Sequence, residues 1–184
     1  MVKSIGKAII GLTHALKELN PDLVLILGDR AEALACAISA VYLNIHLAHI
    51  HGGDKSRGGL DESARHAITK FSHIHFAATQ KSAERIRKLG EDEKIIYVVG
   101  APGLDSILHK KLLSKKKIAE KFNLDPDKGY FLVVQHPVST EPERASSQME
   151  ETLNAIVHFK GETIVIYPNS DSGGKEIIKK IREY

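Results

Sequence analysis

The stretch LVLILGDRAEALACAISA, from Leu23 to Ala40, changes its character near the middle. It begins as an apolar run, stops at Gly28-Asp29-Arg30, and continues with small and apolar residues at helical spacing. This order is typical of a buried parallel strand that leads into a helix. Because open parallel sheets bind ligands outside the carboxyl ends of their strands, the carboxylate and the guanidinium at this end indicate a candidate site.

The same alternation of short apolar runs and helical patterns continues along the chain. We predict strands at Leu23–Leu27, His46–Ile50, Ile74–Ala78, Ile95–Val99, Tyr130–Gln135 and Thr163–Tyr167. We predict helices at Ala31–Leu43, Asp61–Phe71, Gln80–Leu89, Lys116–Phe122, Glu143–Phe159 and Lys175–Arg182. Such alternation predicts an α/β fold in which helices cover both faces of parallel strands.

The segment Lys110–Lys128 is rich in lysine, and Pro126 and Gly129 precede a new strand. We interpret it as a boundary, with a first domain over residues 1–113, a junction over 114–129 and a second domain over 130–184. The second part has two predicted strands, which are too few to bury a satisfactory core. We therefore expect a chain truncated at its C-terminus and also at its N-terminus, where a helix precedes the first strand.

The composition of the 184 residues, with 42% hydrophobic and 27% charged residues and a net charge of +3, is that of a globular protein. Low aromatic content and dispersed acids argue against binding nucleic acid. No apolar stretch is long enough to cross a membrane, and residues 1–19 form an amphipathic pattern rather than a secretion signal. The single cysteine, Cys36, is expected to be a buried thiol, which is consistent with a cytoplasmic protein.

Glycine together with an acid follows four of the six predicted strands, and a histidine, His136, follows a fifth. The candidate residues at these ends are Gly28, Asp29, Arg30, His51, Gly52, Gly53, Gly100, Pro102, His136, Asn169 and Asp171. A glycine-rich loop then leads into a helix that begins with Asp61 and Glu62 and carries Arg65 and His66 one turn later. Each residue alone has a plain explanation as a helix cap or a turn, but the set favours a functional edge of the sheet.

Six of the ten histidines lie between His46 and His75. The pairs His49-x-His51 and His73-x-His75 alternate onto one strand face, as half of a zinc site would. No cysteine partner and no HExxH spacing accompanies them, so we predict contact with substrate or packing, and no metal site.

Several segments together resemble the UDP-N-acetylglucosamine 2-epimerases. They are GDRAEALACAISA, NIHLAHIHGGD, LDESARHAITKFSHIHFAAT, VVGAPGLD, VVQHPVSTEPE and YPNSDSGGKEI. The resemblance is to the hydrolysing branch of sialic acid and related nonulosonic acid synthesis. It implies two Rossmann-like domains of the GT-B type, no cofactor, and a reaction in which UDP is eliminated and water adds to a 2-acetamidoglucal.

The resemblance also implies roles for individual residues. Asp29 matches the carboxylate of a Gly-Asp motif, and Asp61, with Glu62 beside it, matches the family's acid/base. His136 matches a histidine that approaches the sugar from the second domain, and RHAITK contributes two binding residues, Arg65 and His66. His51 stands where many members have a catalytic glutamate, and an imidazole can serve as a base near neutral pH. The loop between Gly53 and Asp61 is one residue longer than the family pattern.

The expected ligand is UDP-N-acetylglucosamine or a related UDP-amino sugar. The expected partner is a second copy or a companion chain that supplies the missing segments. Two alternatives remain at this point. One is a non-catalytic binding or assembly module on the epimerase scaffold. The other is a GT-B glycosyltransferase, against which the acid-rich strand ends argue.

Overall fold

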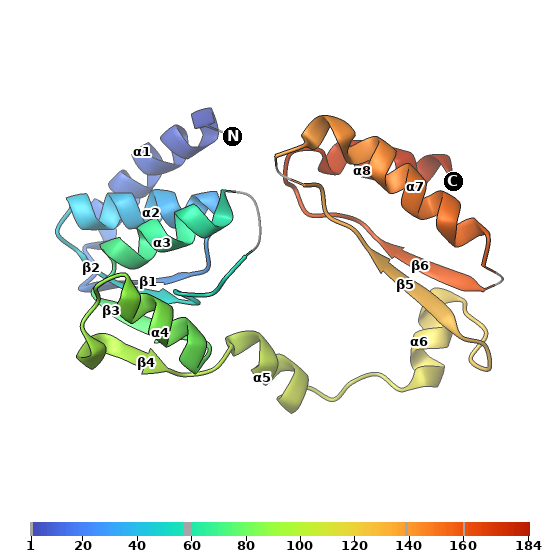
Figure 1. The fold of residues 1–184 in the computed structure, drawn as a ribbon, viewed down its shortest axis with the longest axis horizontal. Coiled ribbons are helices and arrows are strands. Elements are labelled where there is room, and N and C mark those ends of the chain that lie inside the picture. Colours follow the sequence, from blue (N-terminus) through green and yellow to red (C-terminus); the bar gives the residue numbers. More distant parts are fainter. Residues whose placement is uncertain (1, 57–59, 139, 160) are drawn as a thin grey trace. The chain divides into compact units, whose positions relative to one another are not determined.

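The computed structural model describes residues 2–56, 60–138, 140–159 and 161–184. Within it the chain forms two compact units, Met1–His109 and Lys110–Tyr184 (Figure 1). Each unit has its own parallel sheet and its own buried cluster of side chains.

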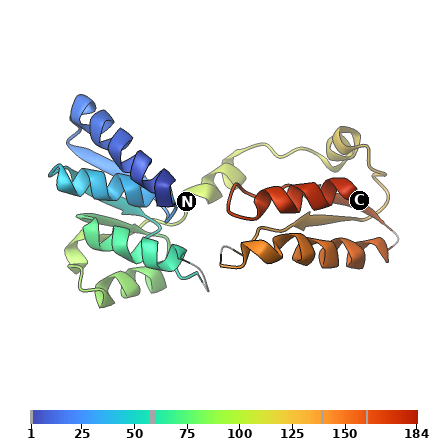
Figure 2. The same ribbon diagram turned by 90° about the horizontal axis from the view of Figure 1, so that it is seen from above.

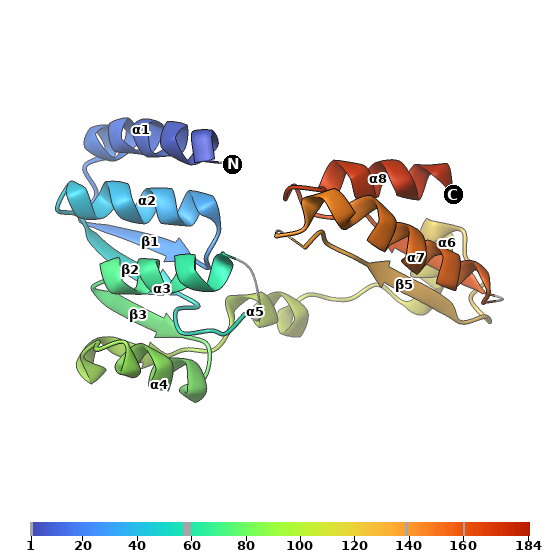
Figure 3. The same cartoon turned by 45° about the horizontal axis from the view of Figure 1, so that its top comes forward.

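The first unit alternates strands and helices from end to end. Its elements are α1 (Val2–Leu19), β1 (Leu23–Leu27), α2 (Ala31–Tyr42), β2 (His46–Ile50), α3 (Asp61–Phe71), β3 (Ile74–Ala77), α4 (Gln80–Lys88), the 3-10 turn η1 (Glu93–Ile95), β4 (Ile96–Val98) and α5 (Pro102–His109). The strands pair in the order β1-β2-β3-β4, all parallel. Figure 3 shows α1 to α4 following one another along the sheet in chain order. The predicted alternation of parallel strands and helices is confirmed.

The core of this unit lies between the strands and α2, α3 and α4. Ile26 of β1 and Leu47 of β2 are buried against small residues of α2 and against Ile68 of α3. Alanines let α2 lie close to the strands. On its other side α2 contacts α1, where Ser39 Oγ donates to the backbone oxygen of Ile9 at 3.2 Å. On β3 and β4 the equivalent cluster forms around Ile86 of α4.

The opposite face of the sheet carries apolar side chains that remain exposed. Since side chains alternate along a strand, the neighbours of Ile26 point away from the helices. Leu23, Leu25 and Leu27 of β1 are exposed, and so is Tyr97 of β4. Among the described residues, the strand-contacting helices α2, α3 and α4 therefore share one face of this sheet, whereas helices on both faces were predicted. Four strands paired in chain order bring each connecting helix to the same side.

The second unit is smaller and has two parallel strands. Its elements are α6 (Lys115–Phe122), β5 (Tyr130–Val134), the 3-10 turn η2 (Pro142–Arg144), α7 (Ala145–Val157), β6 (Glu162–Ile166) and α8 (Gly174–Glu183). Figure 2 shows α7 and α8 side by side. Their contact buries Met149 of α7 and Ile177 of α8, with Val165 of β6 packed against them.

The predicted elements differ from the observed ones mainly at their ends. The strand predicted at Thr163–Tyr167 begins and ends one residue earlier, at Glu162–Ile166. The helix predicted at Glu143–Phe159 is divided into η2 and α7, because the chain enters α7 through a 3-10 turn, a common start for a helix. None of the described helices is both long and apolar enough to span a bilayer.

Candidate active site

The first unit turns sharply where β1 ends, and Gly28 makes the turn. Its φ of +79° lies in the left-handed region that favours glycine. The N–H of Gly28 donates to the oxygen of Ile50 at 3.0 Å, and its own oxygen lies 2.8 Å from His49 Nε2. These two bonds fix the backbone just before Asp29, at the carboxyl ends of β1 and β2.

Asp29 forms an ion pair with Arg65 of α3. The two side chains are 19% and 10% exposed, so both charges are largely removed from water. Buried charges are stable when they are paired. A second bond holds the Arg65 guanidinium, because Nη1 donates to the backbone oxygen of Asp54 at 2.8 Å. Arg65 thus links the segment after β1 with the segment after β2.

The backbone leaves β2 through a second left-handed residue, His51, with φ of +67°. A non-glycine residue in this region is strained, and such strain often marks a functional site. The His51 N–H donates to the oxygen of Phe76 at 3.1 Å, which holds it at the edge of β3. Its imidazole Nδ1 lies 2.7 Å from Asp54 Oδ2.

The loop after His51 is pressed against the start of α4. A Cβ atom at Gly53 would overlap the backbone oxygen of Ser82, and the φ of +72° also requires glycine there. Arg85 of α4 donates to the Gly53 oxygen, and Ser82 Oγ donates to Asp54 Oδ1 at 2.7 Å. Gly52 is also confined, since a Cβ atom there would lie 3.0 Å from His49 Nδ1. The backbone at Gly52 and Gly53 is therefore closely held by its surroundings.

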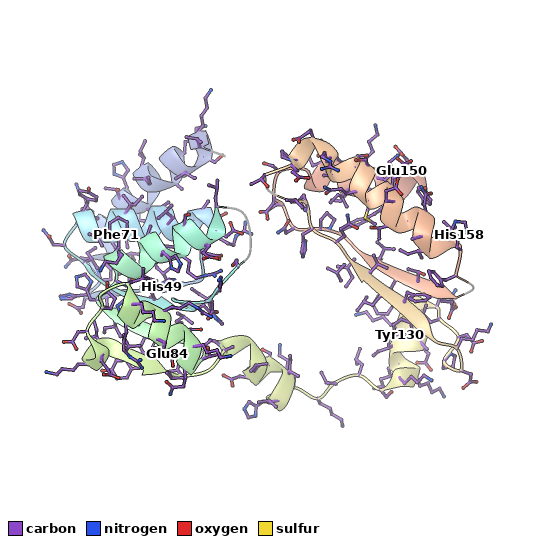
Figure 4. All side chains as sticks on the ribbon, viewed as in Figure 1. His49, Phe71, Glu84, Tyr130, Glu150 and His158 are labelled. Atoms are coloured by element: carbon purple, nitrogen blue, oxygen red, sulfur yellow. The ribbon has the colours of Figure 1, made fainter. Side chains whose placement is uncertain are left out.

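His49 is fully buried. Figure 4 labels it within the first unit. Burial lowers the pKa of His49 to about 4, while the bond to Gly28 opposes the change. The imidazole is therefore neutral near pH 7. Since a carbonyl can only accept, Nε2 carries the proton and donates to Gly28, while Nδ1 faces Thr69 Oγ1 at 3.2 Å.

Four further predicted residues of this unit, Asp61, Glu62, His66 and Arg30, lie in α3 or next to α2. Asp61 is exposed in the first turn of α3, and Glu62 lies one turn before His66, with Oε1 3.7 Å from Nε2. Arg30, the N-cap of α2, bonds to Glu32 of the same helix at 3.3 Å. Arg57, Gly58 and Gly59 of the glycine-rich loop lie outside the described residues, so the predicted extra residue between Gly53 and Asp61 is not placed.

The remaining predicted residues of the first unit follow β4. Gly100 has φ of +83° and Pro102 is the first residue of α5. Since β4 is separated from β1 by two strands, the structure gives these residues no described contact with Asp29 or His51.

In the second unit, three predicted residues lie together where β5 and β6 end. His136 Nδ1 accepts from the backbone N–H of Asn169 at 3.1 Å. The Asn169 side chain donates to Asp171 Oδ2 at 2.7 Å. Gly173, with φ of +95°, leads into α8, and a Cβ atom there would crowd Ala145 and Pro137. The loops of this unit therefore present an imidazole, an amide and a carboxylate from one edge.

Comparison with known proteins identifies the fold and the family. The profile of the UDP-N-acetylglucosamine 2-epimerase family matches residues 1–184. The chain belongs to this family. It is 43% identical over its whole length to the UDP-N,N'-diacetylbacillosamine 2-epimerase (hydrolyzing) of Legionella pneumophila, and covers 48% of that protein. It is 35% identical to the UDP-N-acetylglucosamine 2-epimerase of Neisseria meningitidis serogroup B, over 98% of this chain and 47% of the relative. The chain thus spans about half the length of these relatives.

Solved epimerase structures share the fold of this family member. The Neisseria meningitidis UDP-GlcNAc 2-epimerase bound to UDP-GlcNAc aligns with a TM-score of 0.77 at 21% identity, covering 97% of this chain and 51% of that one. The Methanocaldococcus jannaschii enzyme in complex with UDP-GlcNAc and UDP aligns with a TM-score of 0.74 at 24% identity, covering 96% of this chain and 50% of that one. These alignments confirm the predicted fold class, α/β with parallel sheets of the GT-B epimerase type.

The histidine pairs of this epimerase-family chain do not share a strand face as predicted. β2 ends at Ile50, and the left-handed His51 turns away from the strand that holds His49. His73 Nδ1 accepts from the N–H of Leu47, and buried His75 lies 3.4 Å from Glu91. Among the residues with described positions, no three His, Cys, Asp or Glu side chains are grouped as a metal site.

Two residues of the candidate site in this epimerase-family chain were not among the sequence predictions. Asp54 joins His51, Arg65 and Ser82 by both its carboxylate and its backbone. A signal for Asp54 existed, because it follows His51 and two glycines directly. Ser82 had none, since it reads as an ordinary polar residue in the first turn of a helix.

Proposed function

We propose that this chain carries the catalytic chemistry of a hydrolysing UDP-sugar 2-epimerase. The observation that supports it most is the cluster at the ends of β1 and β2. There a carboxylate (Asp29), a guanidinium (Arg65) and an imidazole (His51) are joined through Asp54 in one network. Family membership supports the substrate class that we propose, a UDP-linked 2-acetamido sugar.

The reaction needs two stages. A base removes the proton from C2 while the bond from C1 to the UDP oxygen breaks, and the electron pair forms the C1–C2 double bond of a 2-acetamidoglucal. Water then adds its hydroxyl to C1, and a proton is delivered to C2 from the opposite face. The products are UDP and a free sugar that is inverted at C2. A general base and a general acid in fixed positions accelerate such steps.

We assign His51 to the C2 proton and Asp29 to the reacting sugar, with Arg65 holding that carboxylate in place. Asp61 and Glu62 are proposed as the acid/base pair in the first turn of α3. The backbone at Gly28, Gly52 and Gly53, with Arg30 and His66, is proposed to line the sugar site.

In the second unit we propose that His136 contacts the substrate, with Asn169 and Asp171 as further binding residues. The bond from the Asn169 N–H to His136 Nδ1 leaves Nε2 as the protonated nitrogen of the neutral ring. A donor of this kind can hydrogen-bond a phosphate oxygen. Gly100 and Pro102 are proposed to bind substrate after β4.

Two relatives suggest two sugars. The Legionella relative is named for UDP-N,N'-diacetylbacillosamine, and the Neisseria relative for UDP-N-acetylglucosamine. Both carry an acetamido group at C2, which is the position that reacts. We propose this class of UDP-2-acetamido sugars as the substrate, and the higher identity to the Legionella relative favours the diacetamido member.

The test incubates the purified chain with each UDP-sugar in heavy water and follows the reaction by proton NMR. Release of UDP with a free, C2-inverted sugar that carries deuterium at C2 is the expected result. An inverted sugar still linked to UDP would contradict hydrolysis and indicate a non-hydrolysing epimerase. Unchanged UDP-sugar whose nucleotide signals do not broaden would overturn the proposal and favour a non-catalytic module.

A further inference from the structure

Asp54 occupies the centre of the polar network in the first unit. Its Oδ2 lies 2.7 Å from His51 Nδ1, its Oδ1 accepts from Ser82 Oγ at 2.7 Å, and its backbone oxygen accepts from Arg65. Each oxygen of this residue thus has a different partner. The arrangement divides the two carboxylate oxygens between a hydroxyl and an imidazole.

The proton positions in this network follow from the chemistry of the groups. An ionised carboxylate has no proton and can only accept hydrogen bonds. The His51 nitrogen that faces Asp54 must therefore carry a proton. When the ring is neutral, the second nitrogen, Nε2, then bears a free lone pair.

We infer that Asp54 is a positioning residue that holds His51 in the Nδ1–H tautomer, so that Nε2 can accept a proton from the substrate. This inference rests on the proposed function for the identity of that proton, the one on C2 of the sugar. A carboxylate that orients a histidine base in this way is a recurrent device in enzymes that differ in fold.

The surroundings of His51 support a role beyond fixing the loop. Its side chain is 26% exposed, so the ring is accessible to a ligand, and within the described residues Nε2 makes no hydrogen bond. The His51 backbone is left-handed, which is uncommon for a residue other than glycine. Here that backbone turns the imidazole off the line of β2 and onto Asp54.

The network also defines a test with an asparagine at position 54. The Ser82 hydroxyl can donate to the oxygen of the asparagine amide but not to its NH₂ group. Ser82 Oγ also lies 2.8 Å from Thr79 Oγ1, which accepts from the Ser82 N–H, so the Thr79 hydroxyl donates to Ser82 Oγ while the Ser82 hydroxyl donates to Asp54. In Asp54→Asn this order of bonds is kept when the amide oxygen Oδ1 stays toward Ser82. The amide NH₂ then faces His51 Nδ1 and can only donate to it. We expect His51 to change to the Nε2–H tautomer, which nitrogen NMR of the chain with labelled histidine detects at a pH where the ring is neutral.

Loss of the free Nε2 lone pair lowers the rate as well. We expect kcat of Asp54→Asn to fall by about 10³–10⁴-fold, by analogy with an inverted tautomer in a serine protease triad, while KM changes little. In the double variant Asp54→Asn with Ser82→Ala the amide is free to turn. Its oxygen can then accept from Nδ1, and the original tautomer and part of the rate should return.

The control is Asp92→Asn, which removes a carboxylate that caps the 3-10 turn η1 and does not contact His51. Nδ1–H in the wild type and Nε2–H in Asp54→Asn support the inference. Nε2–H in the wild type, or the same tautomer in both, would overturn it. If the tautomers behave as expected but the wild type turns over neither UDP-sugar, the positioning of His51 stands and the proposed function fails.

Discussion

Two histidines that are two residues apart show how the surroundings decide the chemistry of a side chain. His49 has no exposed surface and donates to a backbone oxygen, whereas His51 lies in a loop beside a carboxylate. Burial in a site of low polarity disfavours the charged form, so His49 is held neutral. The loop position leaves His51 open to a ligand. We therefore assign a structural role to the first and a chemical role to the second.

The buried His49 predicts a loss of stability in acid. Its pKa is about 4 in the folded protein and about 6.5 when exposed, so the unfolded chain binds more protons between these values. The contribution of neutral His49 to the free energy of unfolding is complete above pH 6.5. It is lost as the pH falls towards 4, by up to about 3 kcal/mol. Burial also lowers the pKa of His75, which acts in the same direction.

Urea unfolding at pH 7 and pH 4.5 measures this effect in the wild type and in His49→Gln. Glutamine retains a donor for Gly28 and does not titrate, so the variant should lose less free energy of unfolding on acidification. An equal loss in both proteins would show that His49 is not the group responsible.

Replacement of Asp29 tests the carboxylate at the end of β1. In Asp29→Asn the side chain keeps its size but loses the charge that pairs with Arg65. We expect turnover of the UDP-sugar to fall by about 10²–10⁴-fold, the usual range for a general acid or base. UDP release gives the rate, and urea unfolding shows whether the fold persists. A rate equal to that of Asp92→Asn would remove the role assigned to Asp29.

At this scale the sequence predicts which residues lie at the strand ends, but not which of them meet. Gly28-Asp29 was identifiable because a glycine and an acid end an apolar run. The pair between Asp29 and Arg65 was not, because it joins residues 36 positions apart and depends on how α3 packs across the sheet. The left-handed φ of His51 also has no signature in the sequence, since residues other than glycine seldom adopt it.

Among the elements, the loop from β2 to α3 shows how packing restricts a backbone. Its glycines were predicted as places where a ligand could approach. At Gly53 the start of α4 occupies the space of a Cβ atom, so packing alone already requires a glycine at this position. The strands were predictable because their apolar runs have clear limits. Their ends shifted by a residue because pairing with the neighbour, rather than composition, decides where a strand stops.

Two glycine substitutions compare a position confined by packing with an open position in a helix. Gly53→Ala should lower the free energy of unfolding by more than about 2 kcal/mol, because it combines a left-handed backbone with a clash against Ser82. Gly6→Ala should raise it by about 0.5–1 kcal/mol, because Gly6 is exposed inside α1 and a Cβ atom there meets nothing. Urea unfolding compares both with the wild type, and a neutral Gly53→Ala would contradict the described loop.

For the molecule as a whole, the lysine-rich segment and Pro126 predicted a junction over residues 114–129, and the two compact units of the chain divide between His109 and Lys110. Composition could not predict how each core is built. The first unit relies on alanines of α2 and on buried strand residues, and the second on a few residues of α7 and α8. Both cores are thin, because each lies on one side of its strands. Apolar side chains on the other side of the first sheet remain in contact with water.

That exposed face predicts self-association. Leu25 is 58% exposed at the centre of β1, between Leu23 and Leu27, and within the described part of the chain no strand pairs with the outer edge of β1. An apolar edge strand of this kind tends to pair with another copy.

Sedimentation velocity at rising concentrations should show larger species for the wild type. Leu25→Lys should shift them towards the monomer, since a lysine on an edge strand opposes pairing. Tyr42→Lys, an equally drastic change at an exposed position that ends α2, should not. A wild type that stays monomeric throughout would show that this face does not drive association.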